Sequence, residues 1–290
     1  MADEKALQVY RAIQALWGME EFKAFADKLV LTAENAARQR ILYPPLPNLI
    51  FAINPGVGVT KHLHLLTGLL KGQKLMRFSG EQDFFEMTFR DPEADFERVL
   101  NSIKIAAGFY GSFRGVVGLD FSWLFRDKQP FKGLEKLKEF IDYQYGRILF
   151  VFIIPLDAEQ RMVDDFIYQF TSYSPIELIH MPFPETKDVM AFIHARLSER
   201  NFKTTPDADK LLTRAVDDLR TDGSFEGFQT LNNLIDAIVW NKLSRRSEDA
   251  ETLTAADLTW IYEEDKLLGL VRSKLRSGPY PRRIGFAQEG

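Results

Sequence analysis

The chain has 290 residues and a mass of 33.4 kDa, and 46% of its residues are hydrophobic, enough for one large domain or two modest ones. The formal net charge of −4 and the pI near 5.7 argue against a protein whose whole surface binds nucleic acid. The absence of cysteine excludes disulfides, thiol catalysis and cysteine metal sites, and is typical of a reducing compartment. The N-terminus lacks the basic start and apolar run of a signal peptide, so the expected location is the cytoplasm.

The first elements in chain order are predicted to be two helices. Residues 3–40 carry apolar side chains at helical spacing, with Trp17-Gly18 as the break between the helices. The following "YPPLPNL" ends helix formation, because proline lacks an amide donor and holds the preceding residue in an extended conformation. Short apolar runs then alternate with amphipathic ones. The predicted strands are 48–53, 74–78, 115–121, 147–154 and 176–181, and the predicted helices between them are 60–70, 94–109, 133–145 and 158–170.

This alternation predicts the α/β fold class. Strands that are apolar on both faces and alternate with helices favour a doubly wound, parallel, five-stranded sheet covered on both sides. From Glu185 onward only helical periodicity remains, which predicts an all-helical lid subdomain with hydroxyl caps at Thr205 and Thr254. The predicted division is N-terminal helices at 1–46, an α/β core at 47–183, a helical lid at 184–270 and a basic C-terminal tail at 271–290.

The segment "INPGVGVT" lies between the first predicted strand of the core and the helix after it. A phosphate-binding loop reads G-x-x-x-x-G-K-[ST], in which backbone amides and the lysine hold phosphates and the hydroxyl binds magnesium. With Gly58 as the last glycine, Ile53 stands at the first glycine, Val59 at the lysine and Thr60 at the hydroxyl. Lys61 does not replace the lysine, because two steps along a helix rotate a side chain by about 200°.

Several segments together resemble one family. "NLIFAINPGVG" resembles the loop of AAA+ ATPases in the group of red-type rubisco activase and stage V sporulation protein K. "GVVGLDFSWLF" resembles that group's Walker B strand, and "FEGFQTLNNLIDAIV" resembles its sensor 2 helix. The resemblance covers nearly the whole chain in the family's order. It implies an AAA+ P-loop NTPase-like core with a helical lid, and ATP or ADP with Mg²⁺ as the cofactors.

The same resemblance implies which functional groups are lost. The Walker A lysine falls on Val59, while the magnesium-binding hydroxyl is kept as Thr60. The magnesium-side aspartate of Walker B is kept as Asp120, but Phe121 stands where the family has the glutamate that activates water. The sensor 2 arginine falls on Gln229.

The arginine finger is also missing, because no arginine occurs between Arg161 and Arg196. Phosphoryl transfer depends on positioning and positive charge, so the chain is expected to hydrolyse ATP poorly or not at all. The nucleotide-binding positions implied by the resemblance are Pro55, Gly56, Val57, Gly58, Val59, Thr60, Asp120 and Gln229, with Thr60 and Asp120 on the metal.

Alternative interpretations of these residues remain open at this point. Gly56 and Gly58 fit either a residual nucleotide site or a tight strand-to-helix turn without a ligand. Asp120 fits either a remnant of a magnesium site or a carboxylate with a local structural role. Phe84 and Phe85 lie near the position of the family's pore loop, and either grip a polypeptide or serve in packing.

The histidines give no predicted metal site. His62 and His64 would point to different faces of a helix, and His180 and His194 have no partner at ligand spacing. The favoured function is a pseudo-ATPase that serves as a scaffold or regulatory subunit, with an active AAA+ ATPase or a second copy of the chain as partner. The alternatives are an AAA+ remodelling ATPase completed by a partner subunit, and a nucleic-acid-binding relative that uses the basic tail, which the acidic pI disfavours.

Overall fold

The computed structural model describes residues 4–108, 112–126, 133–170, 174–221, 225–245, 249 and 251–262. The chain divides into two compact units, Met1–Phe183 and Pro184–Gly290. Within the described ranges, no helix is both long enough and apolar enough to cross a membrane.

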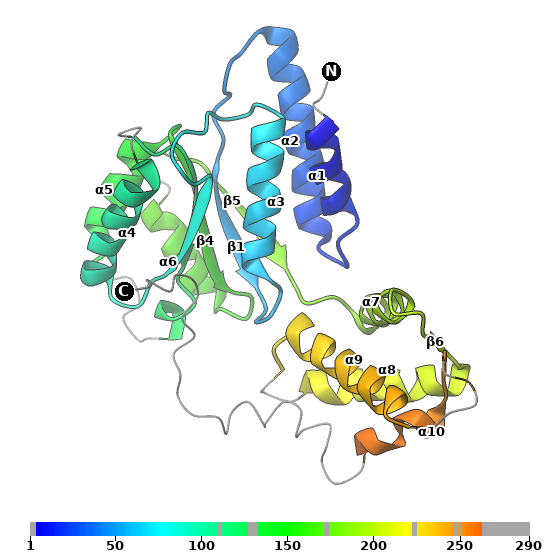
Figure 1. Ribbon diagram of the computed structural model, residues 1–290. Coiled ribbons are helices and arrows are strands. Elements are labelled where there is room, and N and C mark those ends of the chain that lie inside the picture. The colour runs from blue at the N-terminus through cyan, green and yellow to red at the C-terminus, as the bar shows by residue number, and fades with distance from the viewer. Residues whose placement is uncertain are drawn as a thin grey trace, which may run out of the picture. The chain divides into compact units, whose positions relative to one another are not determined.

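The first unit starts with α1 (Glu4–Gln14) and α2 (Glu20–Gln39), which are the two helices predicted at the N-terminus. An alternation of strands and helices follows (Figure 1). The strands are β1 (Asn48–Ile53), β2 (Phe84–Thr88), β3 (Gly115–Asp120), β4 (Ile148–Pro155) and β5 (Ile176–Met181). The helices are α3 (Val59–Gly72), α4 (Pro92–Ala107), the 3₁₀ helix η2 (Leu124–Arg126), α5 (Glu135–Gln144) and α6 (Gln160–Phe170).

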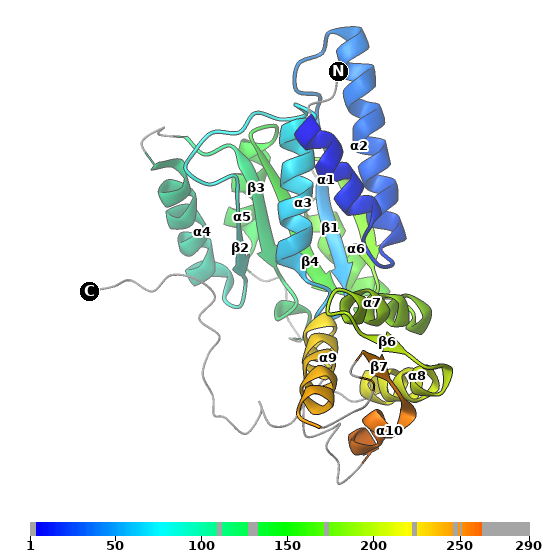
Figure 2. The ribbon, with the colours of Figure 1, turned by 45° about the vertical axis from the view of Figure 1, so that its right-hand side comes forward.

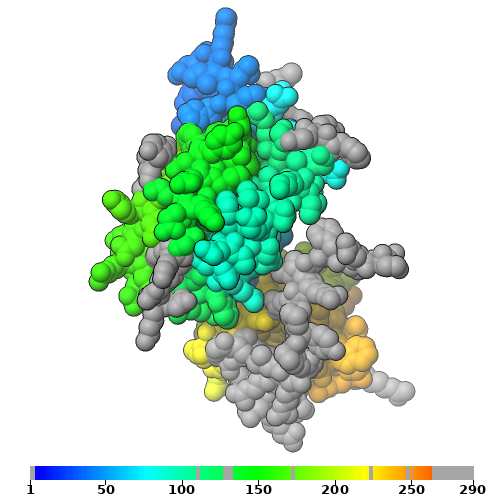
Figure 3. Space-filling model, turned by 90° about the vertical axis from the view of Figure 1, so that its left-hand side faces the viewer, coloured from blue at the N-terminus to red at the C-terminus, as the bar shows by residue number. Residues whose placement is uncertain are grey.

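The five strands form one sheet in the order β2-β3-β4-β1-β5, and every neighbouring pair is parallel. Helices α1, α2 and α3 pack on one face, and α4, α5 and α6 pack on the other (Figures 1 and 2). Figure 3 shows the side on which α4 and α5 lie. The predicted fold class, a doubly wound parallel five-stranded sheet of the P-loop NTPase type followed by a helical subdomain, is confirmed.

Strand β1 shows why both faces of the sheet are apolar. Successive side chains of a strand point to opposite faces, so Leu49 and Phe51 pack with α1–α3 while Ile50 and Ala52 pack with α4–α6. Complete burial of a side chain such as Phe51 contributes about 1.5–3 kcal/mol. The continuous apolar run is therefore what a strand between two helical layers requires.

The strand predicted at 74–78 is wrong. Leu75 is buried and Phe78 packs against the α1–α3 cluster, but the segment connects α3 to β2 without joining the sheet. The strand lies instead at Phe84–Thr88. Phe84 packs towards α1–α3 and Phe85 towards α4–α6, so the packing interpretation of these two residues is confirmed.

Helix α2 covers one edge of the sheet. The outer strand β5 presents backbone groups that have no neighbouring strand on that side. Glu21 Oε2 accepts a hydrogen bond from the His180 backbone N at 2.7 Å, and Lys28 Nζ donates to Glu177 Oε2 at 2.7 Å. Helix α2 thus supplies a hydrogen-bond acceptor to a backbone N–H of this edge strand and an ion pair to one of its side chains.

The second unit is mainly helical, as predicted. Its helices are α7 (Thr186–Ser198), α8 (Pro206–Thr221), α9 (Phe228–Leu243), α10 (Ala255–Leu258) and the 3₁₀ helix η3 (Thr259–Tyr262). A short parallel ladder of β6 (Lys203–Thr204) and β7 (Thr252–Leu253), which the sequence did not predict, is added to them. The helical pattern predicted beyond Tyr262 and the tail at 271–290 lie outside the described residues.

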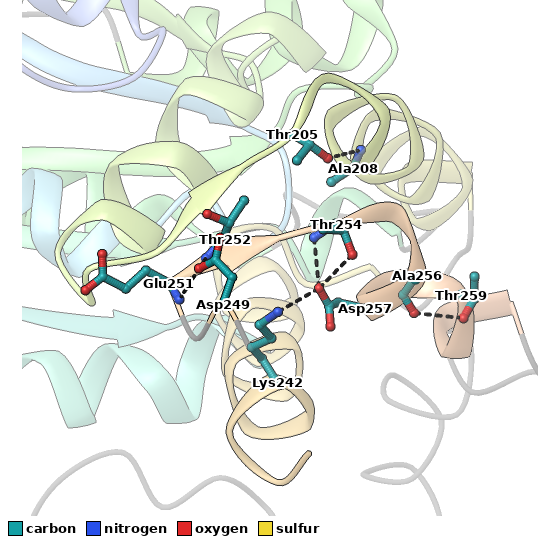
Figure 4. Close-up of polar contacts among 10 residues, drawn as sticks. All are labelled: Thr205, Ala208, Lys242, Asp249, Glu251, Thr252, Thr254, Ala256, Asp257 and Thr259. Atoms are coloured by element: carbon teal, nitrogen blue, oxygen red, sulfur yellow. Dashed lines mark hydrogen bonds and ion pairs between the residues drawn. The ribbon is translucent and has the colours of Figure 1, made fainter. Parts of the chain in front are cut away.

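Thr205 caps α8 with its hydroxyl, and Thr254 begins α10 in a capping box with Asp257 (Figure 4). The Ala208 backbone N donates to Thr205 Oγ1 at 3.4 Å, and both the N and Oγ1 of Thr254 donate to Asp257 Oδ2 at 2.9 Å. The buried Lys242 of α9 also donates to Asp257 Oδ2, at 2.9 Å. Burial alone would raise the pKa of Asp257, but the bonds from Thr254 and Lys242 outweigh it and lower that pKa.

Candidate functional site

The loop between β1 and α3 makes a tight turn at the carboxyl end of the central part of the sheet. Gly56 and Gly58 have φ values of 80° and 86°, in the left-handed region that favours glycine. A Cβ on Gly58 would meet no atom within 4 Å. Glycine is therefore needed at this position for its backbone conformation and not for space. Pro55 and Gly56 are exposed, while Val57 is buried.

The side chain at the lysine position packs against the core. Val59 is the first residue of α3 and packs, partly buried, against the apolar cluster formed with α1 and α2. Lys61, which follows it by two residues, is exposed, as expected from helical geometry. At the position where a phosphate loop has its lysine, this chain has an apolar side chain that packs against the core.

The hydroxyl at Thr60 has a partner that the sequence analysis missed. Thr60 Oγ1 donates to Glu86 Oε2 at 2.8 Å. Glu86 lies in β2, whose neighbour β3 ends at Asp120. Glu86 as a whole is an exposed residue. Partial withdrawal of its carboxyl group from water raises its pKa, the bond from Thr60 lowers it, and the nearby Asp120 carboxylate raises it further. One hydroxyl and two carboxylates therefore gather at this end of the sheet.

Asp120 carries a local bond in addition to its influence on Glu86. It is the last residue of β3, and its Oδ1 accepts a hydrogen bond from the Ser122 backbone N at 2.9 Å. The carboxylate at this position of a Walker B strand would face magnesium. In this chain the Asp120 carboxylate bonds to the turn that follows β3.

Phe121 is part of the aromatic core. It is fully buried and stacks on Phe89 with 4.9 Å between ring centroids. The ring of Phe166 lies 5.1 Å away and that of Phe152 lies 6.0 Å away. The residue at the position of the water-activating glutamate is thus one of several rings that hold β3, β4 and α6 together.

A buried histidine fixes the loop from within α3. His62 Nδ1 lies 2.9 Å from the Gly58 carbonyl oxygen, and because a carbonyl only accepts, Nδ1 carries the proton. Burial lowers the pKa of His62 to about 4, and its ring packs edge-on against Phe22 at 5.2 Å. His64 is exposed, so the two histidines face different sides of the helix, as predicted.

The remaining candidate residues are His180 in the first unit, and His194 and Gln229 in the second. His180 contacts Glu21, and His194 Nε2 lies 2.8 Å from Asp209 Oδ1. Gln229 is an exposed residue in the first turn of α9, in the second unit. Among the residues that the structure describes, no group of three or more His, Cys, Asp or Glu side chains could hold a metal ion.

Comparisons with known proteins identify no family. No protein-family model matches the chain, and no curated protein matches it. A solved structure of the RuvB Holliday junction branch migration motor from Thermotoga maritima aligns at 15% identity and a TM-score of 0.47, covering 91% of this chain and 78% of that one. A mutant of the same RuvB aligns at 16% identity and 0.47, covering 92% and 81%. These are similarities of chain path alone.

The residues at this site do not fit a magnesium nucleotide as they are arranged. A phosphate loop needs a lysine facing the β and γ phosphates and a hydroxyl that can bind the metal. Here the lysine position is apolar at Val59, and the Thr60 hydroxyl already donates to Glu86. The charged side chains beside that hydroxyl are two carboxylates, Glu86 and Asp120, whereas phosphoryl transfer depends on positive charge around the phosphates.

Proposed function

We propose that this chain is an AAA+-like pseudo-ATPase, which acts as a scaffold or regulatory protein-interaction module and binds nucleotide weakly or not at all. The observation that carries the proposal is the packing of Val59 against the α1–α3 cluster at the lysine position. The resemblance of the sequence to the AAA+ group of red-type rubisco activase and stage V sporulation protein K supports the family assignment.

Three further features support the loss of catalysis. Phe121 is buried among aromatic rings at the position that the resemblance assigns to the water-activating glutamate. Gln229 replaces the sensor 2 arginine, and no arginine lies between Arg161 and Arg196 to serve as a finger. A partner subunit could supply a finger to this site, but the Walker A lysine has to come from within the loop itself.

A protruding apolar surface supports the role in protein contacts. At the end of α2, Ile41 is 47% exposed, Leu42 is 83% exposed and Tyr43 is 49% exposed. The end of α2 and the loop after it extend beyond the sheet in Figures 1 and 2. Arg38 and Arg40 are exposed beside them. Grouped apolar residues with arginine at the rim are typical of contact surfaces, and the proposed partner is an active AAA+ ATPase or a second copy of this chain.

Calorimetric titration with ATP and with ADP, each with and without Mg²⁺, tests the proposal, together with an assay of phosphate release. The wild-type chain should give no magnesium-dependent binding in the micromolar range and no phosphate release above the buffer rate. Thr60→Ala is the matched control, because it removes the one polar side chain kept from the Walker A pattern. Micromolar binding by the wild type that Thr60→Ala abolishes would overturn the proposal and favour an ATPase completed by a partner subunit.

A further inference from the structure

The contact between Thr60 and Glu86 changes the phosphate-loop site in addition to the loss of the Walker residues. We infer that Glu86 closes the phosphate-loop site to magnesium nucleotides, because its carboxylate takes the Thr60 hydroxyl and places negative charge beside the loop. This inference rests on the proposed function and adds to it a residue that no loop motif contains. It predicts that two differences keep nucleotide from the site: the presence of Glu86 and the absence of the Walker A lysine.

The position of Glu86 follows from the alternation of β2. Phe84 packs towards the α1–α3 cluster and Phe85 towards the opposite face. Glu86, two residues after Phe84, therefore lies on the face of the sheet that α3 covers. The 2.8 Å bond to Thr60 in the first turn of α3 agrees with this placement.

The neighbouring strand leaves room for this arrangement. Gly118 of β3 is the register partner of Glu86 in β2. A Cβ at Gly118 would lie 2.6 Å from Leu63 Cδ1 and 3.5 Å from Glu86 Cγ. Alanine at position 118 would therefore require the Leu63 side chain of α3 to shift, while its contact with Glu86 would be an ordinary van der Waals one. The glycine thus lets α3 lie close to the strand beside Glu86.

The charge near the loop is opposite to that of a phosphate-binding site. Asp120 follows Gly118, the register partner of Glu86, by two residues, so its side chain lies on the same face of the sheet as the Glu86 carboxylate. Val59 contributes no charge, and Lys61 is exposed on another side of α3. Like charges repel at this range, so the carboxylates oppose the entry of a triphosphate.

It follows that a lysine at position 59 should not be sufficient to restore binding. An ammonium group introduced there would be attracted to the Glu86 carboxylate, and the Thr60 hydroxyl would remain bonded to the same group. Removing Glu86 as well would release the hydroxyl and leave the new lysine free to meet phosphate. The two substitutions should therefore be strongly non-additive.

The experiment compares full-length wild type, Glu86→Ala, Val59→Lys, Val59→Lys with Glu86→Ala, and Val59→Lys with Glu86→Gln by calorimetry with MgATP. Thermal unfolding verifies that each variant is folded. The Glu86→Ala double variant should bind at least tenfold more tightly than Val59→Lys alone. The Glu86→Gln double variant separates charge from hydrogen bonding, because glutamine can still accept the Thr60 hydroxyl, and its affinity should be intermediate.

Equal affinity of Val59→Lys and its Glu86→Ala double variant, within twofold, would overturn the inference while leaving the proposed function intact. Binding of MgATP by the wild type that Glu86→Ala weakens would overturn both, since Glu86 would then act as a ligand. If Val59→Lys does not fold, the wild type and Glu86→Ala are compared with inorganic tripolyphosphate. Glu86→Ala should then bind at least tenfold more tightly, and equal or absent binding in both would contradict the inference.

Discussion

At the scale of single residues, His62 makes the stability of the first unit depend on pH. Its pKa lies near 4 in the folded chain, against 6.5 for an exposed histidine. At pH values between these two pKa values, His62 is therefore protonated in the unfolded chain and neutral in the folded chain. The contribution of the neutral His62 ring to the free energy of unfolding is fully present above pH 6.5 and is lost as the pH falls towards 4. Between pH 7 and pH 5 the expected loss is about 2 kcal/mol.

Denaturant titrations of the wild type and of His62→Leu at pH 7 and pH 5 measure this loss. The leucine variant should lack the part of the pH dependence that comes from His62. His64→Leu, on the exposed side of the same helix, keeps the buried ring and is the control. If His62→Leu and His64→Leu change the pH dependence by the same amount, His62 does not contribute in this way.

The residues of the site differ in how far the sequence could predict them. Val59, Thr60 and Asp120 follow from motif spacing, because a loop between strand and helix places its residues by local geometry alone. Glu86 is 26 residues from Thr60, and their contact depends on the pairing of β2 with β3 and on the approach of α3. Its one signal in the sequence is an acidic residue within the apolar run "DFFEMTF".

At the scale of elements, an ion pair between the buried Lys242 and the partly buried Asp257 joins the C-terminal part of α9 to the start of α10 (Figure 4). Asp257→Ala should destabilise the second unit by about 3 kcal/mol, because it removes the carboxylate facing a buried ammonium and both bonds from Thr254. Lys242→Met should cost less, because it removes the buried charge and leaves the Thr254 bonds in place.

Urea unfolding of both single variants and of the double variant measures the coupling of this pair. The double variant should be less destabilised than the sum of the single ones. Lys242→Met removes the buried ammonium group that Asp257→Ala would leave without its carboxylate partner. Strictly additive effects would mean that the pair does not act as a unit.

Strands and helices with clear apolar or amphipathic patterns were predictable from the sequence, and the edge strand β2 was not. The inner strands β1, β3 and β4 are nearly continuous apolar runs, as burial on two faces requires. The other edge strand, β5, was predicted although it includes Glu177 and His180. The edge strand β2 is only partly buried and includes Glu86. Residues 74–78 are just as apolar, but Leu75 and Phe78 bury their side chains from a connecting segment. Side-chain burial alone does not determine which backbone joins the sheet.

At the scale of the whole molecule, the N-terminal helices belong to the first compact unit. They contribute buried side chains to the α1–α3 cluster, among them Ile13, Phe22, Phe25 and Leu29. Helix α1 lies so close to α3 that a Cβ on Gly72 would be 2.6 Å from the Ala6 Cβ. Removing both helices would expose the apolar side chains of the α1–α3 cluster that they cover, together with the edge of β5.

Two fragments test this dependence. Residues 1–183 should fold alone, with a cooperative thermal transition and helical circular dichroism, because both core clusters of the sheet lie within this fragment. Residues 47–183 should aggregate or lack a cooperative transition, since the apolar face covered by α1 and α2 would meet water. A 47–183 fragment as stable as 1–183 would show that the two helices are an appendage to the sheet. Loss of folding in 1–183 would instead show that the first unit depends on the second.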